Sequence, residues 1–333
     1  MFLSVVAPCF NEEEGLKEFY QRVVKAVKAT HATFYEIILV DDGSKDRTWD
    51  VICSLQRQDS NVRGFKLSRN FGHQSALTAG LLSARGDYIF IIDSDLQDPP
   101  ELLTPMLERM CDGFDVVYGQ RKNRAGETYF KKASAHLFYR FLSLLADINI
   151  PKDTGDFRLM NRKVLMAYQS LNESHRFTRG LIAWLGFKQT ALPYDRHARF
   201  AGTTKYPLMK MINFSLDAVT GFSLKPLRLI ILVGVVTSFV ALLALAYTLY
   251  GWVFSKNIPG WTSLMTVILL LSCVQLICVG VVGEYVGRTF TETKRRPLYF
   301  IQDSMDATAD SQGDKLETLT MAANHPNIHN ELQ

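Results

Sequence analysis

The sequence of 333 residues predicts an α/β domain followed by a hairpin of two membrane-spanning helices. Over residues 1–120, short runs rich in Val, Ile and aromatic residues alternate with segments of helical periodicity, which is the pattern of βαβ units. Two later segments, 229–254 and 261–283, carry no charged residue and no histidine over 26 and 23 residues. About 20 apolar residues are enough to cross a bilayer as a helix.

Composition narrows the class of protein. The chain has 37 Lys+Arg and 33 Asp+Glu, and the resulting net charge of +4 is too small to indicate a nucleic-acid partner. With 21% charged and 11% aromatic residues, global disorder is excluded. The five cysteines form no C-x-x-C pair, which argues against a disulfide framework or a structural zinc site and favours a reducing compartment.

The predicted sheet has five strands in its first part, at 3–7, 36–40, 62–67, 88–92 and 115–118. The first helix follows from apolar residues at helical spacing over 16–27, with Asn11 as its expected N-cap. Nearly continuous apolar strands indicate a sheet covered on both faces. In such sheets ligands bind beyond the carboxyl ends of the strands.

The membrane part is expected to comprise an amphipathic interface helix over 206–225 and a hairpin over 226–288, with spans at 229–254 and 261–286. Basic residues flank the outer ends of the hairpin, whereas the connection holds only Lys256. The positive-inside rule then places residues 1–205 and both termini in the cytoplasm. The amphipathic stretch 128–146 fits a core helix and an interface helix equally well, and 289–333 is expected to be a largely disordered tail.

Two strand ends carry paired carboxylates. Asp93 and Asp95 follow the strand 88–92, and side chains two residues apart in an extended chain point to the same side. Such a pair suits Mg²⁺ or Mn²⁺ bridging a diphosphate. Asp41 and Asp42 follow the second strand and suit the base and ribose of a nucleotide, although part of the segment 41–48 has the alternative role of capping the next helix.

Several ordered motifs resemble family 2 glycosyltransferases. They are APCFNEE at 7–13, DDGS at 41–44, DSDLQDPP at 93–100, GDFRL at 155–159, RG at 179–180 and GTTKY at 202–206. The nearest branch is that of the polyprenyl-phosphate hexosyltransferases, which includes dolichol-phosphate mannose synthase and the bactoprenol glucosyltransferases. The paired C-terminal spans are similar to those of the bactoprenol branch.

The resemblance implies a GT-A type, Rossmann-like domain over 1–205 that transfers a sugar from a nucleotide donor to a lipid phosphate with inversion. It implies Asp95 and Asp93 as ligands of Mg²⁺ or Mn²⁺, and Asp95 and Asp156 as catalytic residues. For Asp156, a role as base and a role in orienting the acceptor both remain open. The residues implied for the nucleotide sugar are Pro8, Asn11, Glu12, Asp41, Asp42 and Asp93.

Basic residues beyond the strand 115–118 are candidates for phosphate binding, because Arg matches phosphate oxygens bidentately. Arg121 and Arg124 are candidates for the acceptor phosphate, and Arg199 and Lys205 for either phosphate group. Solvation or attraction to the membrane surface is their alternative role. The histidines His73, His136, His175 and His197 show no metal-ligand spacing and are interpreted as surface or core residues.

The predicted reaction is transfer of one glucose from UDP-glucose to undecaprenyl phosphate. Glucose is preferred only through the closeness to the bactoprenol glucosyl branch; GDP-mannose, a UDP-N-acetylhexosamine or a UDP-amino-pentose are alternative donors. A processive polysaccharide synthase is disfavoured because no Q-x-x-R-W motif is present, and an inactive membrane scaffold is the remaining alternative. A second copy of the chain, through Gly280, Gly283 and Gly287, and a downstream lipid-sugar flippase are further candidate partners.

Overall fold

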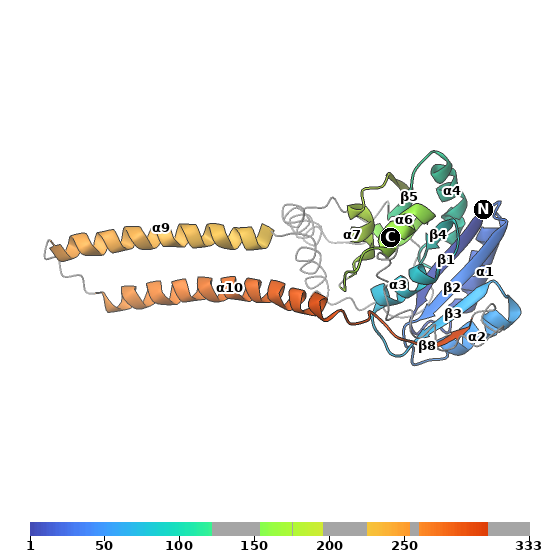
Figure 1. The fold of residues 1–333 in the computed structure, drawn as a ribbon, viewed down its shortest axis with the longest axis horizontal. Coiled ribbons are helices and arrows are strands. Elements are labelled where there is room, and N and C mark those ends of the chain that lie inside the picture. Colours follow the sequence, from blue (N-terminus) through green and yellow to red (C-terminus); the bar gives the residue numbers. More distant parts are fainter. Residues whose placement is uncertain (122–153, 175, 196–224, 254–259, 306–333) are drawn as a thin grey trace, which may run out of the picture. The chain divides into compact units, whose positions relative to one another are not determined.

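The computed structural model describes residues 1–121, 154–174, 176–195, 225–253 and 260–305. Its elements belong to two units, which are described separately (Figure 1). The first unit is an α/β domain that also includes the residues from Arg296 onward. The second unit contains two long helices, α9 (Lys225–Val253) and α10 (Trp261–Lys294).

The first unit is built on one sheet of eight strands in the order β7-β5-β6-β4-β1-β2-β3-β8. All five strands expected in the first part of the chain are present. Strands β4, β1, β2 and β3 form a parallel part of the sheet, in that order. Strand β6 is antiparallel to both of its neighbours, β4 and β5. The bounds are β1 Phe2–Cys9, β2 Phe34–Asp41, β3 Val62–Leu67, β4 Tyr88–Ile91, β5 Val116–Arg121, β6 Thr154–Asn161, β7 Gln189–Tyr194 and β8 Ile301–Met305.

Helices cover both faces of the sheet, as the apolar strands predicted. Val5 and Ile37 pack in a core with residues of α1, α2 and α4, whereas Val6 and Ile38 face α3, where Gly80 leaves room for them. Alternate side chains of one strand therefore serve two separate apolar layers. The helices of this unit are α1 Leu16–Lys28, α2 Thr48–Gln58, α3 His73–Ser83, η1 Pro100–Leu102, α4 Leu103–Cys111, α6 Arg162–Gln169 and α7 Thr178–Trp184.

The helix start predicted at Asn11 is wrong. The helix α1 begins at Leu16 after Gly15, and Asn11 instead adopts a left-handed conformation with φ 55°. The Asn11 Oδ1 atom accepts a hydrogen bond from the backbone N–H of Lys45 at 2.9 Å. Asparagine is one of the few residues with a side chain that tolerates this conformation at low cost. Asn11 thus shapes a turn after β1 and leaves the start of α1 without a side-chain cap.

The second unit contains the helices of the predicted hairpin. The helix α9 has 29 residues and α10 has 34, and they contact each other. Apolar side chains such as Phe239 and Leu276 are exposed along them. By length and composition, the part of α10 from Leu270 to Lys294 is able to cross a membrane. The helix α10 extends beyond the predicted span end at residue 286, and the predicted interface helix over 206–225 lies outside the described residues except for its last residue.

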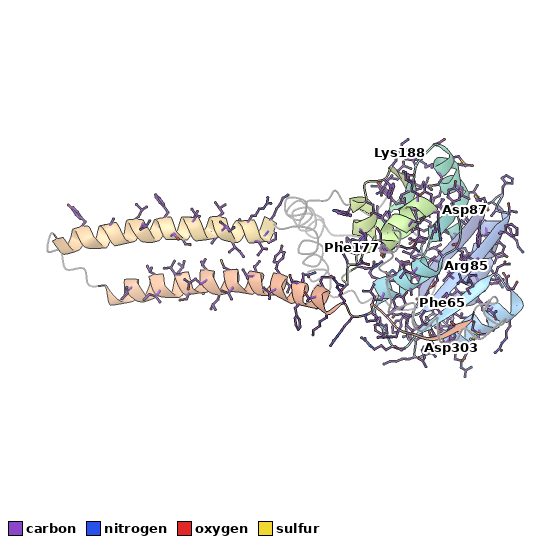
Figure 2. All side chains as sticks on the ribbon, in the orientation of Figure 1. Phe65, Arg85, Asp87, Phe177, Lys188 and Asp303 are labelled. Atoms are coloured by element: carbon purple, nitrogen blue, oxygen red, sulfur yellow. The ribbon has the colours of Figure 1, made fainter. Side chains whose placement is uncertain are left out.

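The prediction of a largely disordered tail over 289–333 is wrong where the structure describes the chain. The helix α10 continues to Lys294, and β8 pairs antiparallel with β3 at the edge of the sheet, where Figure 2 shows Asp303. The Phe300 carbonyl oxygen accepts a hydrogen bond from Ser68 N at 2.9 Å. The ring of Phe300 contacts the ring of Phe71. Five mostly polar residues form this strand because β3 offers unpaired backbone groups, which local sequence does not reveal.

The middle of β5 is closely packed against aromatic rings. A Cβ atom at Gly119 would lie 2.4 Å from Phe157 and 2.8 Å from Tyr194. These two rings stack edge to face at 5.4 Å, and Phe157 also stacks on Phe90 at 5.4 Å. We therefore expect Gly119→Ala to destabilise the domain by about 1–3 kcal/mol through overpacking. Thermal unfolding of the full chain in detergent measures this effect, and an unchanged midpoint would contradict the packing described.

Candidate active site

The loops after β1 and β2 form one continuous rim at the carboxyl edge of the sheet. Asn11 N donates a hydrogen bond to Ser44 Oγ at 2.9 Å, and Lys45 N donates to Asn11 Oδ1 at 2.9 Å. Glu12 N donates to Thr48 Oγ1 at 2.9 Å. Since β1 and β2 are parallel neighbours, both loops leave the sheet at the same edge. These bonds fix the segments that the family resemblance connects with the nucleotide.

The two aspartates at the end of β2 have different surroundings. Asp41 is buried, and its Oδ1 accepts a hydrogen bond from Ser44 N at 3.0 Å, while its Oδ2 has no hydrogen-bond partner among the described residues. Asp42 accepts hydrogen bonds from Phe71 N at 2.8 Å and Gly72 N at 3.0 Å. Asp42 therefore holds the loop that precedes α3, and its contact with a nucleotide remains a prediction.

Within the segment 41–48, the alternative role of capping the next helix is confirmed for Asp46, which lies just before α2. Asp46 Oδ1 accepts hydrogen bonds from the backbone N–H of Thr48 at 3.0 Å and from its hydroxyl at 2.6 Å. Burial works to raise the pKa of Asp46, but these hydrogen bonds outweigh it and lower the pKa below its usual range. Asp46 thus stabilises the start of α2, whereas Asp41 keeps one oxygen available.

The second acidic pair follows β4. Ser94 Oγ donates to Pro8 O at 2.9 Å and so ties this loop to β1. The Asp93 Oδ1 atom is buried without a hydrogen-bond partner among the described residues. Burial raises the pKa of Asp93 to about 6; the charge of His73 opposes this shift, and the charges of Asp156, Asp98 and Asp95 act in the same direction as burial. Asp95 Oδ1 accepts a hydrogen bond from Gln97 N at 3.1 Å.

Asp156 reaches this edge through the antiparallel pairing of β6 with β4. In that pairing Ile91 lies opposite Arg158, and two further steps along both strands bring Asp93 opposite Asp156. Asp156 Oδ2 accepts a hydrogen bond from Gln74 Nε2 at 2.8 Å, and its Oδ1 is buried without a hydrogen-bond partner in the described part of the chain. The structure therefore brings together two predicted site residues that are 63 positions apart in sequence (156 − 93 = 63): Asp93 lies just after β4, and Asp156 lies on the adjacent strand β6.

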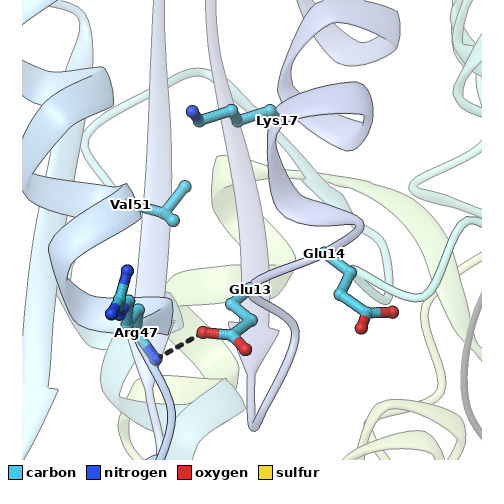
Figure 3. Close-up of a pocket in the computed structure, with 5 residues that line it drawn as sticks. All are labelled: Glu13, Glu14, Lys17, Arg47 and Val51. Atoms are coloured by element: carbon cyan, nitrogen blue, oxygen red, sulfur yellow. Dashed lines mark hydrogen bonds between the residues drawn. The ribbon is translucent and has the colours of Figure 1, made fainter.

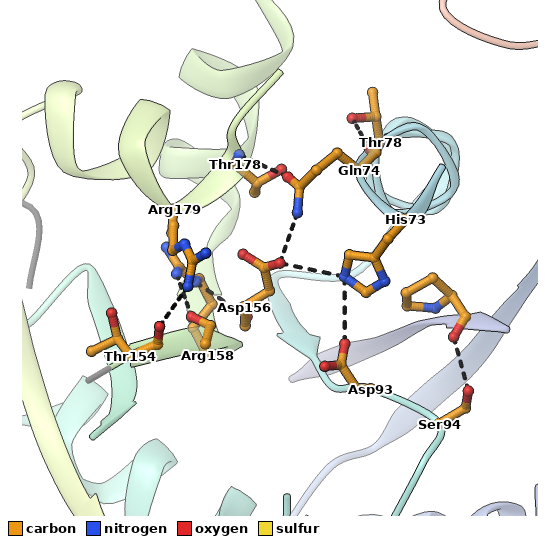
Figure 4. A network of polar contacts seen from close by, with 12 residues as sticks. His73, Gln74, Thr78, Asp93, Ser94, Thr154, Asp156, Arg158, Thr178 and Arg179 are labelled. Atoms are coloured by element: carbon orange, nitrogen blue, oxygen red, sulfur yellow. Dashed lines mark hydrogen bonds and ion pairs between the residues drawn. The ribbon is translucent and has the colours of Figure 1, made fainter. Parts of the chain in front are cut away.

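His73 lies between these two carboxylates (Figure 4). Its Nε2 is 3.5 Å from Asp93 Oδ1 and 3.3 Å from Asp156 Oδ2. Burial works to lower the pKa of His73, but the hydrogen bond to Asp156 and the charge of Asp93 outweigh it and raise the pKa to about 9. His73 is exposed, in agreement with the interpretation as a surface residue, but that interpretation missed its contacts with two carboxylates of the candidate site. The strand-end pattern does not reveal it, because His73 begins α3 after a loop that follows β3, whereas Asp41 ends β2 and Asp93 lies just after β4.

Two arginines support the segment that carries Asp156. Arg158 donates to the backbone oxygens of Asp156 at 3.2 Å and Gly155 at 3.0 Å, and Arg179 donates to Thr154 O at 2.7 Å. Burial alone would raise the pKa of Asp156. The hydrogen bond from His73 and the charges of Arg179 and Arg158 outweigh burial and hold that pKa well below its usual range. Asp156 is therefore ionised at neutral pH.

Arg121 is the one basic candidate that the described residues include. Its guanidinium lies 3.1 Å from the position of a Cβ atom on Gly155, and its Nε donates to Tyr194 OH at 3.5 Å. The Tyr194 hydroxyl donates in turn to Asp98. Arg121 thus lies beside the segment of Asp156, and its role in phosphate binding stays a prediction. The other basic candidates, Arg124, Arg199 and Lys205, lie outside the described residues.

A shallow depression on the surface involves other residues (Figure 3). It is lined by Glu13, Glu14, Lys17, Arg47 and Val51, and Glu13 Oε2 accepts a hydrogen bond from Arg47 N at 2.9 Å. None of these residues belongs to the acidic edge formed by Asp41, Asp93 and Asp156. The candidate site is therefore placed at the carboxyl edge of the sheet and not at this depression, because the buried carboxylate oxygens without hydrogen-bond partners lie at that edge.

The acidic edge fits a divalent cation that is held by only one or two carboxylates together with the substrate. Among the described residues, no group of three or more His, Cys, Asp or Glu is arranged as a metal site. Mg²⁺ commonly uses only one or two carboxylates together with substrate phosphates and water. A buried carboxylate oxygen of Asp93 without a hydrogen-bond partner, two residues before Asp95, fits that mode.

Comparisons with known proteins agree with this geometry. The model of Glycosyl transferase family 2 matches residues 4–169, and that of the GtrB C-terminal hairpin matches residues 225–289. Uncharacterized glycosyltransferase YkcC of Bacillus subtilis (strain 168) is 48% identical over 90% of this chain and 93% of that protein. The Prophage bactoprenol glucosyl transferase homolog of Escherichia coli (strain K12) is 38% identical over 91% and 99%. The Bactoprenol glucosyl transferase of Shigella phage SfII is 37% identical over 91% and 98%.

These matches confirm the expected GT-A type α/β fold and the expected family. The GtrB hairpin match covers α9 and most of α10, and it indicates that the protein is associated with a membrane. With relatives of this identity matched over more than nine-tenths of their length, the chain belongs to glycosyltransferase family 2 and is a glycosyltransferase.

Proposed function

We propose that this glycosyltransferase moves one glucosyl group from UDP-glucose to undecaprenyl phosphate at the cytoplasmic face of a membrane. One observation carries the proposal. Three carboxylate oxygens, on Asp41 at the end of β2, on Asp93 just after β4 and on Asp156 near the start of β6, are buried at this edge of the sheet without hydrogen-bond partners among the described residues; that of Asp93 lies 3.5 Å from His73 Nε2. Such groups are costly unless a ligand completes them. The names of the bactoprenol glucosyl transferases support the choice of sugar and acceptor.

The donor is assigned to the rim formed by the loops after β1 and β2. The unpartnered oxygen of Asp41 is suited to a donor N–H or O–H of the nucleoside. Asp93 and Asp95 would hold Mg²⁺ or Mn²⁺, which supplies positive charge to the leaving diphosphate when bound. Pro8, Asn11 and Glu12 shape the same rim through the backbone contacts described above.

In the proposed reaction an acceptor phosphate oxygen bonds to the anomeric carbon as the bond from that carbon to the diphosphate breaks. The bonding electrons leave with the nucleoside diphosphate. A lipid phosphate is already ionised at neutral pH, so that the step needs no strong base. The low pKa of Asp156 agrees with this, because an efficient general base has a pKa near the working pH. We therefore assign Asp156 the role of orienting the acceptor or a sugar hydroxyl.

Arg121 is assigned to the acceptor phosphate, since its guanidinium lies beside the Gly155–Asp156 segment. The basic flanks of the hairpin, with Arg288 and Lys294 near the end of α10, support an orientation with the catalytic domain in the cytoplasm. There the soluble donor is available, while the polyprenyl chain remains in the lipid. The hairpin would hold the site at the surface that the lipid phosphate reaches.

A transfer assay tests the proposal. The full chain, purified in detergent with undecaprenyl phosphate and Mg²⁺ or Mn²⁺, is incubated separately with labelled UDP-glucose, GDP-mannose, UDP-N-acetylglucosamine and a UDP-amino-pentose. We expect label in the lipid phase with UDP-glucose, as one sugar per lipid. If label enters the lipid only with another donor, that donor supplies the transferred sugar in place of glucose. A polymeric product would favour a processive synthase, and no label with any donor would overturn the proposal.

A further inference from the structure

Gln74 connects three elements around the candidate site (Figure 4). It lies in the first turn of α3, and its Nε2 donates to Asp156 Oδ2 on β6 at 2.8 Å. Its Oε1 accepts a hydrogen bond from the backbone N–H of Thr178, the first residue of α7, at 2.9 Å. A single amide thus bridges residues 82 and 104 positions away in the chain.

The chemistry of the two neighbours fixes the direction of this amide. A backbone N–H only donates, so Thr178 requires the oxygen of Gln74 on its side. An ionised carboxylate only accepts, so Asp156 requires the nitrogen. Exchanging the two ends of the amide would lose both hydrogen bonds, and the orientation of Gln74 is therefore determined by its partners.

The backbone of Gln74 is also held in place. Its carbonyl accepts a hydrogen bond from Thr78 Oγ1 at 2.7 Å, and that hydroxyl lies 3.1 Å from the hydroxyl of Tyr168. The Tyr168 hydroxyl lies 3.2 Å from Thr178 Oγ1, and all three hydroxyl-bearing residues are buried. This chain of hydroxyl groups joins α3, which carries Gln74, to α7 through Tyr168 of α6, and it holds Gln74 close to Thr178.

The two oxygens of Asp156 are consequently different. Oδ2 receives Gln74 and lies near His73, whereas Oδ1 is buried and has no hydrogen-bond partner among the described residues. We propose that Gln74 is a positioning residue, which fixes Oδ2 so that Oδ1 is directed to the acceptor or to a sugar hydroxyl. This inference rests on the proposed function, because it concerns the orientation of the residue that would contact the substrate.

Two substitutions separate this role from a structural one. Gln74→Glu keeps an oxygen for Thr178 N but removes the donor to Asp156 and places a second carboxylate beside it. Gln74→Leu removes both bonds at similar volume. If Gln74 positions Asp156, we expect both variants to lower kcat about 100-fold, since a misplacement of about 1 Å can have that effect. If Gln74 only anchors α7, Gln74→Glu will retain the wild-type kcat.

The measurements are the lipid-linked transfer assay on the full chain, UDP binding by calorimetry, and thermal unfolding. For Gln74→Glu we expect a lowered kcat with the Kd for UDP within about twofold of wild type, because Gln74 makes no contact with the nucleotide rim. Gln189→Leu is the matched control: Gln189 Nε2 donates to Ile182 O at 2.9 Å, away from Asp156, and kcat should be unchanged.

The outcomes keep the two proposals apart. A wild-type chain that binds UDP but transfers no sugar to lipid would contradict the proposed function. An active wild type together with a Gln74→Glu variant of equal kcat would overturn the positioning role alone. A Gln74→Glu variant that loses UDP binding and kcat together with its unfolding midpoint would also overturn it, since the effect would then be structural.

Discussion

Replacing Asp156 with Asn is expected to lower kcat for sugar transfer by about 100- to 1,000-fold, which is the range for removing one preorganised polar contact from a transition state. The physical reason lies in its neighbours. Gln74 Nε2 and His73 Nε2 both face Oδ2, so the introduced amide places its oxygen there and its NH₂ group where Oδ1 was. The variant thus loses a negative charge and presents a donor where the substrate requires an acceptor.

The measurement compares kcat with UDP-glucose and undecaprenyl phosphate for the two proteins. Asp115→Asn is the matched control, because Asp115 is hydrogen-bonded to Asn161 at 2.8 Å, at the opposite end of β6 from Asp156. We expect the control to retain the wild-type kcat and the Asp156→Asn variant to retain its affinity for UDP. Equal rates for wild type and Asp156→Asn would exclude a direct contact between this carboxylate and the reacting groups.

The parts of the site that sequence predicted are those encoded locally. Asp41 and Asp93 each stand directly after a run of apolar strand residues, and parallel strands end at one edge, so their convergence follows from the pattern alone. The same rule applied to β3 does not indicate His73, because a loop separates the end of β3 from His73 at the start of α3. Metal-ligand spacing does not indicate it either, because a histidine that bridges two carboxylates needs no second histidine or cysteine nearby in sequence.

The remainder depends on pairing between distant segments. Asp156 meets Asp93 only through the register of β6 against β4, and an antiparallel strand inserted between parallel ones has no local signature. The strand β8 is a similar case, since Ile301–Met305 lacks a strong apolar alternation and is stabilised by pairing with β3. For Asn11 the local sequence allows two structures, because asparagine suits both a helix cap and a left-handed turn. The hydrogen bond from Lys45 N, in a different loop, selects the turn.

We expect removal of divalent cations to abolish transfer, and Asp95→Ala to lower the rate by about 100- to 1,000-fold at saturating Mg²⁺ or Mn²⁺. The leaving diphosphate gains negative charge as the sugar departs, and at this edge Asp93, Asp95 and Asp98 add to that charge. Without a cation, these carboxylates repel the diphosphate. With one, the buried Oδ1 of Asp93, which has no hydrogen-bond partner among the described residues and lies 3.5 Å from His73 Nε2, would serve as a ligand.

Titration of the transfer rate with Mn²⁺ after treatment with a chelator checks this expectation, together with calorimetry of UDP with and without the ion. Wild type should bind UDP more tightly with Mn²⁺, and Asp95→Ala should lose most of that difference, whereas Asp112→Ala, at an exposed residue after α4, should behave as wild type. Full activity in the presence of chelator would mean that side chains of the protein, and not a cation, supply the positive charge that stabilises the leaving diphosphate. His73 and Arg121 would then be the groups to substitute. His73 pairs with Asp93, and although burial works to lower the pKa of Arg121, its hydrogen bond to Tyr194 and the charges of Asp98 and Asp93 raise it.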